Sequence, residues 1–457
     1  MRVTTGVGRG MRVVAALMSL SGFSQLHAAE VSAAAREPIT MWFWGASPAE
    51  RKALQEALIE PFNRSQSRYQ LVIEYRTSVD NDVRIAAIAN RGPDIIYTSG
   101  PGDALPLARA AKLEPLDRYA AQYGWNQRLL APVLDTCRQF GHLVCVPPSL
   151  CVNGMFYNAA VLAANGWQVP KSRADVEAIM RAAQRRGMYG SVTGNGGWEP
   201  VNEDYVSVFL NQIAGPRLLR EVLSGRASWT APPMQEAMNE LNRWYRSGFL
   251  GGSDYFVLNF DSSLSLLHQG RAPFFFAPVF AFQWATAYFQ GAEANDLRFA
   301  PFPNMNPALP YPLFDVGSAF SLSINAHSHV KDGAAAVLNW ILSRQFVLAV
   351  SRQWPGYWAI PLVDFPQDPQ ATGVTRRYYE AMEQITAAVR RGAYGYNVDA
   401  YFPDVTKALL GQDLEAVWLG QETSDQMLQR AGRALARERS RGATLSDIPL
   451  PDFKEEP

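Results

Sequence analysis

The sequence has no excess of charge of either sign and contains few of the residues from which metal sites are built. Its 457 residues include 42 Lys and Arg against 42 Asp and Glu, so the formal net charge is zero. This balance gives no reason to expect nucleic acid or an anionic membrane surface as a partner. The five histidines and three cysteines form neither a helical HExxH pair nor a usual zinc framework.

Motifs of the common enzyme classes are also missing. The chain has no GxSxG, which excludes a nucleophile elbow, and no GxxxxGK[ST], which excludes a phosphate-binding P-loop. Carboxylates do cluster at Glu199, Glu203 and Asp204, and Asp315 lies close before Gly317. Nothing in the sequence brings two of them to one substrate. We therefore expect a protein that is not an enzyme and that has neither cofactor nor metal.

The N-terminus has the features of a secretory signal peptide. Arg2, Arg9 and Arg12 precede an apolar run over 13–23, and small residues follow at 28 and 29. The run is too short to span a bilayer, and no cysteine near it offers a lipid anchor. We expect residues 1–29 to be removed, with cleavage near Ala28 or Ala29, and the mature protein to be periplasmic.

Export permits disulfide formation, and all three cysteines lie in the stretch "CRQFGHLVCVPPSLC". Two strand-like segments flank its "FGH". A turn centred on Gly141 would place Cys137 opposite Cys145 at bridging distance. Cys151 would then lie outside the disulfide. Three reduced, buried thiols remain the alternative.

From residue 38 onwards the chain alternates apolar strands with amphipathic helices. Strands are expected at 39–44, 69–75 and 93–102, and a helix at 48–63, with Ser47 as its N-cap. "FDVGSAFSLSI" is expected to be one late strand, followed by one helix over 331–346. This rhythm predicts an α/β fold with a mostly parallel sheet and helices on both faces. The 48% of hydrophobic residues suffice for a large core and two lobes.

Aromatic residues recur at strand ends and in loops. An aromatic face can bury the C–H face of a pyranose, while nearby polar groups satisfy its hydroxyls. In "ITMWFWGAS", alternation places Trp42 and Trp44 on one side of the strand. Trp42, under a helix, and Phe43 are expected in the core, and Trp44 at the carboxyl edge, where ligands of open α/β sheets bind. The other candidates are Trp198, Phe280, Trp284, Trp354, Tyr357 and Trp358.

The order of several segments resembles the extracellular solute-binding proteins of ABC importers, of the type of maltose-binding protein. The segments are "ITMWFWG", "PFNRS", "GPDIIYTSG", "AKLEPLD", "GHLVCVPPSLCVNGMFYN", "EAMNELNRWYRSG", "LLHQGRAPFFFAPVF" and "DVGSAFSLSINAHSHVKDGAAAVLNWILS". The resemblance implies a periplasmic-binding-protein-like α/β fold, with two discontinuous lobes joined by a hinge around a central cleft. It implies a monomer that binds a carbohydrate and delivers it to an inner-membrane permease.

By this resemblance, the N-lobe comprises residues 38–149 and 317–351, and the C-lobe 152–315 and 354–457. The chain would cross between them near 147–153, 315–318 and 352–357.

The resemblance also implies a set of ligand-binding residues, to which Trp198 and Glu199 are added as a loop aromatic and a neighbouring acid: Trp44, Gly45, Ser47, Thr98, Ser99, Gly100, Ser149, Cys151, Phe280, Trp284, Gly317, Ser318, Trp354 and Tyr357. Two positions depart from the family pattern. Cys151 stands where several relatives carry an acidic or polar residue, and Thr98 where an aromatic residue is frequent. If Cys151 faces the cleft, Cys137–Cys145 is the better disulfide pair.

Two alternatives remain open. One is a secreted carbohydrate-active enzyme that uses an acid pair such as Glu199 with Asp315. The other keeps the scaffold but binds a phosphate ester or a polyamine instead of a sugar.

Overall fold

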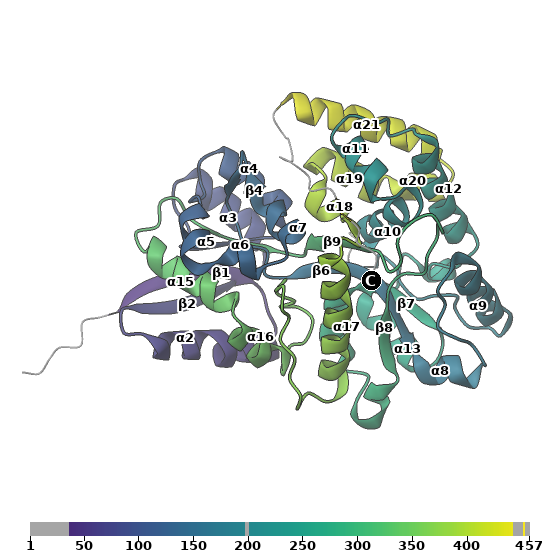
Figure 1. The fold of residues 1–457 in the computed structure, drawn as a ribbon, viewed down its shortest axis with the longest axis horizontal. Coiled ribbons are helices and arrows are strands. Elements are labelled where there is room, and N and C mark those ends of the chain that lie inside the picture. Colours follow the sequence, from purple (N-terminus) through teal and green to yellow (C-terminus); the bar gives the residue numbers. More distant parts are fainter. Residues whose placement is uncertain (1–35, 197–200, 442–450, 453–457) are drawn as a thin grey trace, which may run out of the picture. The chain divides into compact units, whose positions relative to one another are not determined.

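The computed structural model describes residues 36–196, 201–441 and 451–452. The described chain forms two α/β lobes, each built around its own sheet (Figure 1). The expected signal peptide, together with Trp198 and Glu199, lies outside the described residues.

The first sheet has four strands in the order β10-β3-β1-β2. The strands are β1 (Glu37–Trp44), β2 (Tyr69–Arg76), β3 (Ile95–Thr98) and β10 (Ser321–Ile324). β1 runs parallel to β2 and β3, whereas β10 runs antiparallel to β3. The expected strands at 39–44 and 69–75 are confirmed, and the parallel prediction holds for the centre of this sheet.

Alternation along β1 decides which of its aromatic residues are core. Ile39, Met41 and Phe43 are fully buried, so the prediction for Phe43 is confirmed. Trp42 and Trp44 lie on the opposite side and are only half-buried. The expectation that Trp42 is core under a helix is wrong, because its ring lies beneath the guanidinium of Arg76, at 3.8 Å.

The helix expected at 48–63 forms, but in three parts. Ser47 caps its start in a capping box with Glu50. The chain then runs through α1 (Pro48–Leu54), a π-helical turn over Gln55–Ile59 and α2 (Glu60–Ser65).

Other helices of the first lobe pack around this sheet. They are α3 (Val79–Ile88), α4 (Pro101–Arg109), α5 (Asp117–Tyr123), α6 (Trp125–Arg128), α7 (Ala131–Leu134), α15 (Lys331–Ile341) and α16 (Arg344–Ser351). Figure 1 shows α15 and α16, which come late in the chain, beside the early strands β1 and β2. The single helix expected at 331–346 is therefore wrong: Ser343 caps a new helix, and the two parts are bent by 60°.

The second sheet has the order β11-β9-β6-β7, with β8 also paired to β6. Its strands are β6 (Leu150–Asn158), β7 (Phe274–Pro278), β8 (Leu297–Ala300), β9 (Phe314–Ser318) and β11 (Tyr394–Tyr396). β6 is antiparallel to β7, β8 and β9, and only β9 and β11 are parallel. The prediction of a mostly parallel sheet is wrong here, because local periodicity reveals a strand but not the direction of its partners.

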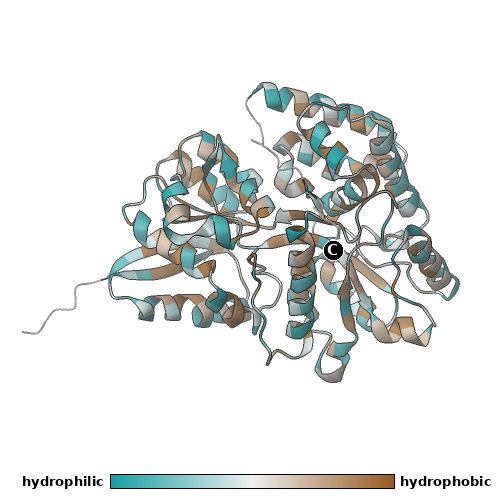
Figure 2. Ribbon diagram, viewed as in Figure 1, coloured by the Kyte–Doolittle hydropathy of each residue, from teal (hydrophilic) through white to brown (hydrophobic). Residues whose placement is uncertain are grey.

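The helices of the second lobe cover this sheet and extend beyond it. They are α8 (Ala159–Ala164), α9 (Arg173–Arg185), α10 (Val201–Phe209), α11 (Pro216–Leu223), α12 (Pro232–Arg246), α13 (Phe260–His268), α14 (Phe282–Ala285), α17 (Gly373–Arg390), α18 (Val398–Tyr401), α19 (Asp404–Gln412), α20 (Leu414–Trp418) and α21 (Ser424–Ser440). Apolar residues concentrate on the strands and polar ones on the outer helix surfaces (Figure 2). Within the described residues no single helix is long and apolar enough to cross a membrane; only the bent pair α15 and α16 qualifies when joined.

The expected single strand "FDVGSAFSLSI" is two strands in two different sheets. β9 ends at Ser318 in the second sheet, and β10 begins at Ser321 in the first. Phe320, between them, is fully buried and stacks on Tyr357, with ring centroids 5.0 Å apart. An unbroken apolar pattern thus conceals the point at which the chain changes sheets.

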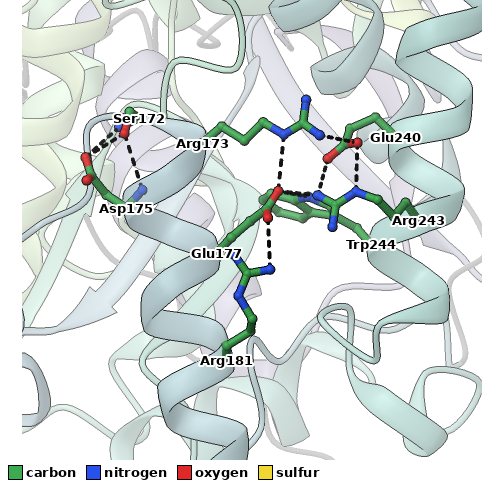
Figure 3. A network of polar contacts seen from close by, with 8 residues as sticks. All are labelled: Ser172, Arg173, Asp175, Glu177, Arg181, Glu240, Arg243 and Trp244. Atoms are coloured by element: carbon green, nitrogen blue, oxygen red, sulfur yellow. Dashed lines mark hydrogen bonds and ion pairs between the residues drawn. The ribbon is translucent and has the colours of Figure 1, made fainter.

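A charged network joins α9 to α12 on the second lobe (Figure 3). Glu177 accepts hydrogen bonds from Arg173, Arg181 and Arg243 and from the Trp244 indole. Burial raises its pKa, but the Arg243 charge and these hydrogen bonds outweigh that effect, so the pKa is lowered. Arg173 of α9 donates to Glu240 of α12, and Arg243 of α12 donates to Glu177 of α9, so the network holds the two helices together. Removing one partner would leave buried charge uncompensated.

A short hairpin of β4 (Arg138–Gln139) and β5 (His142–Leu143) carries the disulfide. Cys137 and Cys145 are bonded, and Cys151 is free and buried. The two strand-like segments expected beside "FGH" form strands of only two residues each, and β5 begins at the histidine of that triplet. Phe140 and Gly141 make the turn with φ of +52° and +81°, a conformation that glycine adopts at little cost.

We predict one thiol per chain in denaturant without reductant, and three after reduction, measured with a chromogenic disulfide reagent. The double variant Cys137→Ser/Cys145→Ser should lose about 2–3 kcal/mol of unfolding free energy, as expected for a short closed loop. Cys151→Ser, which leaves the bridge intact, is the control. Three thiols before reduction would contradict the bond.

Candidate ligand-binding site

A pocket of about 450 Å³ lies where the ends of the first-lobe strands face the second lobe. This volume falls within the range of roughly 300–1,000 Å³ of small-molecule sites. The first lobe contributes Trp44, Tyr97, Ser99 and Asp103, and the chain crossings contribute Cys151, Ala319 and Tyr357. The second lobe contributes Glu203, Asp204, Phe260, Phe280, Gln283, Trp284 and Lys407.

The first aromatic wall is built on Trp44 and Tyr357. Trp44 ends β1, at the carboxyl edge that β1 shares with parallel β3. Its ring centroid lies 5.7 Å from that of Tyr357 and 6.1 Å from that of Trp354, which stacks on Tyr357 at 4.5 Å. The Trp354 indole donates to Gln283 Oε1 of the second lobe at 3.0 Å. Trp354 therefore packs against both rings and connects them to α14.

The Tyr357 ring is also held by its hydroxyl and its backbone. Its hydroxyl lies 3.5 Å from that of Tyr97, and its carbonyl accepts from Ser149 Oγ. Burial, with the neighbouring Tyr97, raises the pKa of Tyr357 well above its ordinary value. The phenol is therefore neutral at physiological pH and can both donate and accept hydrogen bonds.

The second aromatic wall comes from the other lobe. Phe280 lies in the 3₁₀ turn that follows β7, and Trp284 lies in α14. Trp284 stacks on Phe260, with centroids 5.2 Å apart and ring planes 16° apart, and meets Phe280 edge-on. Each lobe thus contributes aromatic side chains to the lining of the pocket.

Charged groups complete the lining. Asp103 lies in the first turn of α4, and Glu203 and Asp204 in the first turn of α10. Lys407 of α19 is the one cation among the described lining residues, and no arginine is among them. The residues that the structure describes hold no group of three or more His, Cys, Asp or Glu side chains suited to a metal ion.

The family model described as bacterial extracellular solute-binding protein matches residues 45–346. The chain belongs to this family. A search of curated protein sequences finds no match.

Solved structures with the same fold include a chitin oligosaccharide binding protein (TM-score 0.74, 16% identity, 89% of this chain and 99% of that chain covered). A maltose-bound binding protein of T. maritima aligns with a TM-score of 0.68, 18% identity, and coverage of 88% and 99%. A Bacillus licheniformis sugar transporter in complex with stachyose aligns with a TM-score of 0.63, 13% identity, and coverage of 87% and 100%. These likenesses confirm the predicted fold class, and the family model confirms the family resemblance.

In this solute-binding protein, six of the residues expected to bind ligand line the pocket: Trp44, Ser99, Cys151, Phe280, Trp284 and Tyr357. Others have structural contacts instead. Ser47 caps α1, Thr98 bonds to Ser321, and Ser149 and Ser318 donate to the carbonyls of Tyr357 and Phe320.

The remaining expected residues lie behind or beside the pocket. Trp354 supports Tyr357, and Gly45 follows β1 without reaching the lining. The Gly100 carbonyl accepts from Thr98 Oγ1. A Cβ on Gly317 would approach Asn397 Cβ to 2.8 Å, so this glycine permits close packing within the second lobe.

Sequence reasoning missed several lining residues. Tyr97 and Phe260 look like ordinary core positions, and Lys407 and Gln283 carry no local signal. Glu203 and Asp204 form an acidic cluster in the sequence close after Trp198, and this was the one sequence signal that indicated a binding role for them. Their place in the pocket depends on α10 packing against α19, where Asn202 donates to the Gly411 carbonyl at 2.9 Å.

Near the pocket residue Cys151, Asp315 of β9 connects β6 to the residue that follows β11. Its Oδ2 accepts from Asn153 Nδ2 at 2.7 Å and from Asn397 Nδ2 at 3.0 Å. Asn397 also lies 3.9 Å from the sulfur of Cys151, which lines the pocket. Burial raises the pKa of Asp315 to about 7, although the two amides lower it. Asp315 itself is not among the lining residues.

We predict that the unfolding free energy falls as the pH rises from about 4 to about 7. In that range the folded chain keeps a proton on Asp315 that the unfolded chain has released. Asp315→Asn retains an acceptor oxygen and cannot ionise, so at pH 8 it should exceed the wild type in stability by roughly 2–4 kcal/mol.

Denaturant titrations at pH 5 and pH 8 measure this difference. Asp364→Asn, at a side chain 84% exposed, is the matched control and should leave the pH dependence unchanged. An equal pH dependence in Asp315→Asn and the wild type would contradict the assignment.

Proposed function

We propose that this protein is the substrate-binding component of an ABC importer, and that it captures a carbohydrate between its lobes and delivers it to a membrane permease. The observation that carries the proposal is the pair of aromatic walls, Trp44 with Tyr357 and Trp284 with Phe280, facing one pocket from two lobes. Carboxylates, a lysine and an amide also line the pocket.

This arrangement matches the chemistry of a sugar ring. Aromatic faces bury the C–H surface of a pyranose with little loss of conformational entropy, and the polar groups between them satisfy its hydroxyls. Because Trp44 belongs to the first lobe and Phe280 and Trp284 to the second, a ligand would contact both sets only when the lobes are together. Binding would therefore favour the closed form over an open one.

The chain crossings are suited to act as the hinge. We propose lobes of 38–149 with 321–351 and of 152–318 with 354–457, joined near residues 149–150, 319–320 and 352–357. The boundary expected at 315–317 moves because Gly317 and Ser318 belong to β9 of the second sheet. Support comes from the backbone at these points: Leu150 N donates to the Ala359 carbonyl at 2.7 Å, and Ala319 N to the Ser149 carbonyl at 2.9 Å.

The comparisons support a carbohydrate ligand and an exported location. The neighbours described above are named for chitin oligosaccharide, maltose and stachyose. The family description itself is extracellular. We propose that the mature protein acts as a periplasmic monomer.

The alternatives have less support. Asp315, one member of the acid pair considered for an enzyme, is buried and hydrogen-bonded to two asparagines away from the lining. A phosphate ester calls for arginine or a cluster of backbone amides. The described lining instead offers three carboxylates, one lysine and no arginine.

The function is tested by thermal shift against mono- and oligosaccharides, sugar alcohols, glycerol phosphates and polyamines. A carbohydrate that binds the folded state should raise the melting temperature in proportion to the logarithm of its concentration. The bound sugar should be recovered unchanged, as shown by mass spectrometry after denaturation. A shift caused by polyamines or glycerol phosphates alone, or a cleaved sugar, would reject the proposal.

Trp44→Ala should weaken binding of the best carbohydrate roughly 10- to 100-fold, because it removes half of the first aromatic wall. Trp42→Ala is the matched control, since Trp42 is on the same strand and side but does not line the pocket. That variant should lose about 1 kcal/mol of stability with its Arg76 contact and keep its affinity. Titration calorimetry measures the affinity of each variant, and thermal denaturation measures its stability. Equal affinity losses in the two variants would show that Trp44 is not part of the site.

A further inference from the structure

We infer that the second lobe carries another binding site, which takes a small organic anion such as a carboxylate or a phosphate monoester. The site is a pocket of about 640 Å³ between the end of α11, the loop that follows it and one face of α21. These two helices lie beside each other at one end of the lobe (Figure 1). The described lining shares no residue with the pocket between the lobes, so the inference does not depend on the proposed function.

The charged residues of this lining are two arginines of α21. They are Arg433 and Arg439, and no carboxylate is among the described lining residues. Arg433 has no hydrogen bond or ion pair with a described residue. Within the same part of the chain, Arg439 donates only to the Leu223 carbonyl, at 3.1 Å. Arg430 of the same helix, by contrast, is paired with two carboxylates. The pocket thus holds two guanidinium groups without a carboxylate partner.

The acids closest in sequence to the lining are bound to other groups. Glu438 accepts from two backbone N–H groups and a hydroxyl at the start of α19. Glu221 pairs with two arginines of its own segment, and Asp425 accepts from two glutamine side chains. None of the three forms an ion pair with Arg433 or Arg439 within the described chain. The positive charge of the pocket is therefore left for a ligand.

The lining also contains uncharged donors. Trp229 is 5% exposed, and its indole N–H has no hydrogen-bond partner among the described residues. The N–H edge of this ring lies beside Gly432 of α21, where an added Cβ would approach Trp229 Cδ1 to 3.3 Å. The hydroxyl oxygens of Ser228 and Thr230 are 2.8 Å apart, and only one of the two can donate in that bond. The other hydroxyl has its O–H available.

This set of groups is suited to an oxyanion on an apolar body. A guanidinium binds a carboxylate or a phosphate through two parallel N–H···O bonds, and indole and hydroxyl donors can serve the same oxygens. A cation would be repelled by the arginines. The volume exceeds what one inorganic ion fills, and apolar side chains supply the rest of the surface: Val222, Ala227, Leu428, Leu435 and Ala436.

The experiment compares anions with neutral molecules of the same shape on the intact protein. The probes are benzoate with benzamide, phenyl phosphate with phenol, and inorganic phosphate alone. Titration calorimetry at neutral pH and low salt measures each affinity. At least one organic anion should bind tenfold or more tightly than its neutral partner, with an advantage that shrinks at high salt. Neutral partners that bind equally well, no binding of either anion, or inorganic phosphate as tight as phenyl phosphate would each overturn the inference.

Variants of α21 assign the binding to this pocket. Arg433→Gln together with Arg439→Gln should weaken the anion at least tenfold, and the exposed Arg433→Gln alone at least threefold. Arg437→Gln is the matched control, because Arg437 is an exposed arginine of the same helix outside the lining, and its affinity should not change. Circular dichroism verifies the fold of each variant. Equal affinities in the double variant and the wild type, or equal losses in Arg433→Gln and Arg437→Gln, would refute the site.

Discussion

The stacking of Tyr357 between Trp354 and Phe320 is the contact on which the site depends. The three rings come from two chain crossings, with centroids 4.5 Å and 5.0 Å apart and nearly parallel planes. The Tyr357 carbonyl also holds Ser149 at a third crossing. A single residue thus joins every segment that passes between the sheets. Tyr357 also lines the pocket, so the contacts that hold these segments together also set the position of a pocket residue.

The two sheets contribute differently to this arrangement. In the first lobe, parallel β1 and β3 end at one edge and bring Trp44 beside the loop that carries Ser99. In the second, antiparallel β6 and β7 run in opposite directions, and the chain leaves β7 through a turn that holds Phe280. The aromatic group of the first lobe therefore depends on a strand end, and that of the second on a turn and the short helix α14.

Local sequence signals predicted the parts of the molecule whose causes are local. The Ser47 cap, the exposed edge position of Trp44 and the pairing of Cys137 with Cys145 follow from a few neighbouring residues. Features that depend on packing between distant segments could not be predicted from the sequence. The split of "FDVGSAFSLSI" depends on Phe320 finding an aromatic partner, and the place of Lys407 depends on α19 meeting α10, about 200 residues earlier.

The roles of hydroxyl side chains were also not predictable from the sequence. Thr98, Ser149 and Ser318 stand at family binding positions, yet each makes a hydrogen bond within the fold. Residue type and order do not reveal whether a hydroxyl serves a ligand or the backbone, because both uses require the same chemistry. The acids of α10 illustrate the converse, since a cluster that resembles a solvated helix end lines the pocket.

The free cysteine in the pocket wall makes the protein a natural scaffold for a biosensor. The disulfide holds Cys137 and Cys145, so Cys151 is the one thiol outside that bond, and it is a buried residue of the pocket lining. A small thiol-directed fluorophore would attach at one defined point without prior mutagenesis. Ligand and label would compete for the same space, so the rate of labelling reports occupancy directly, in a detergent-free assay that needs neither the permease nor a radioactive sugar.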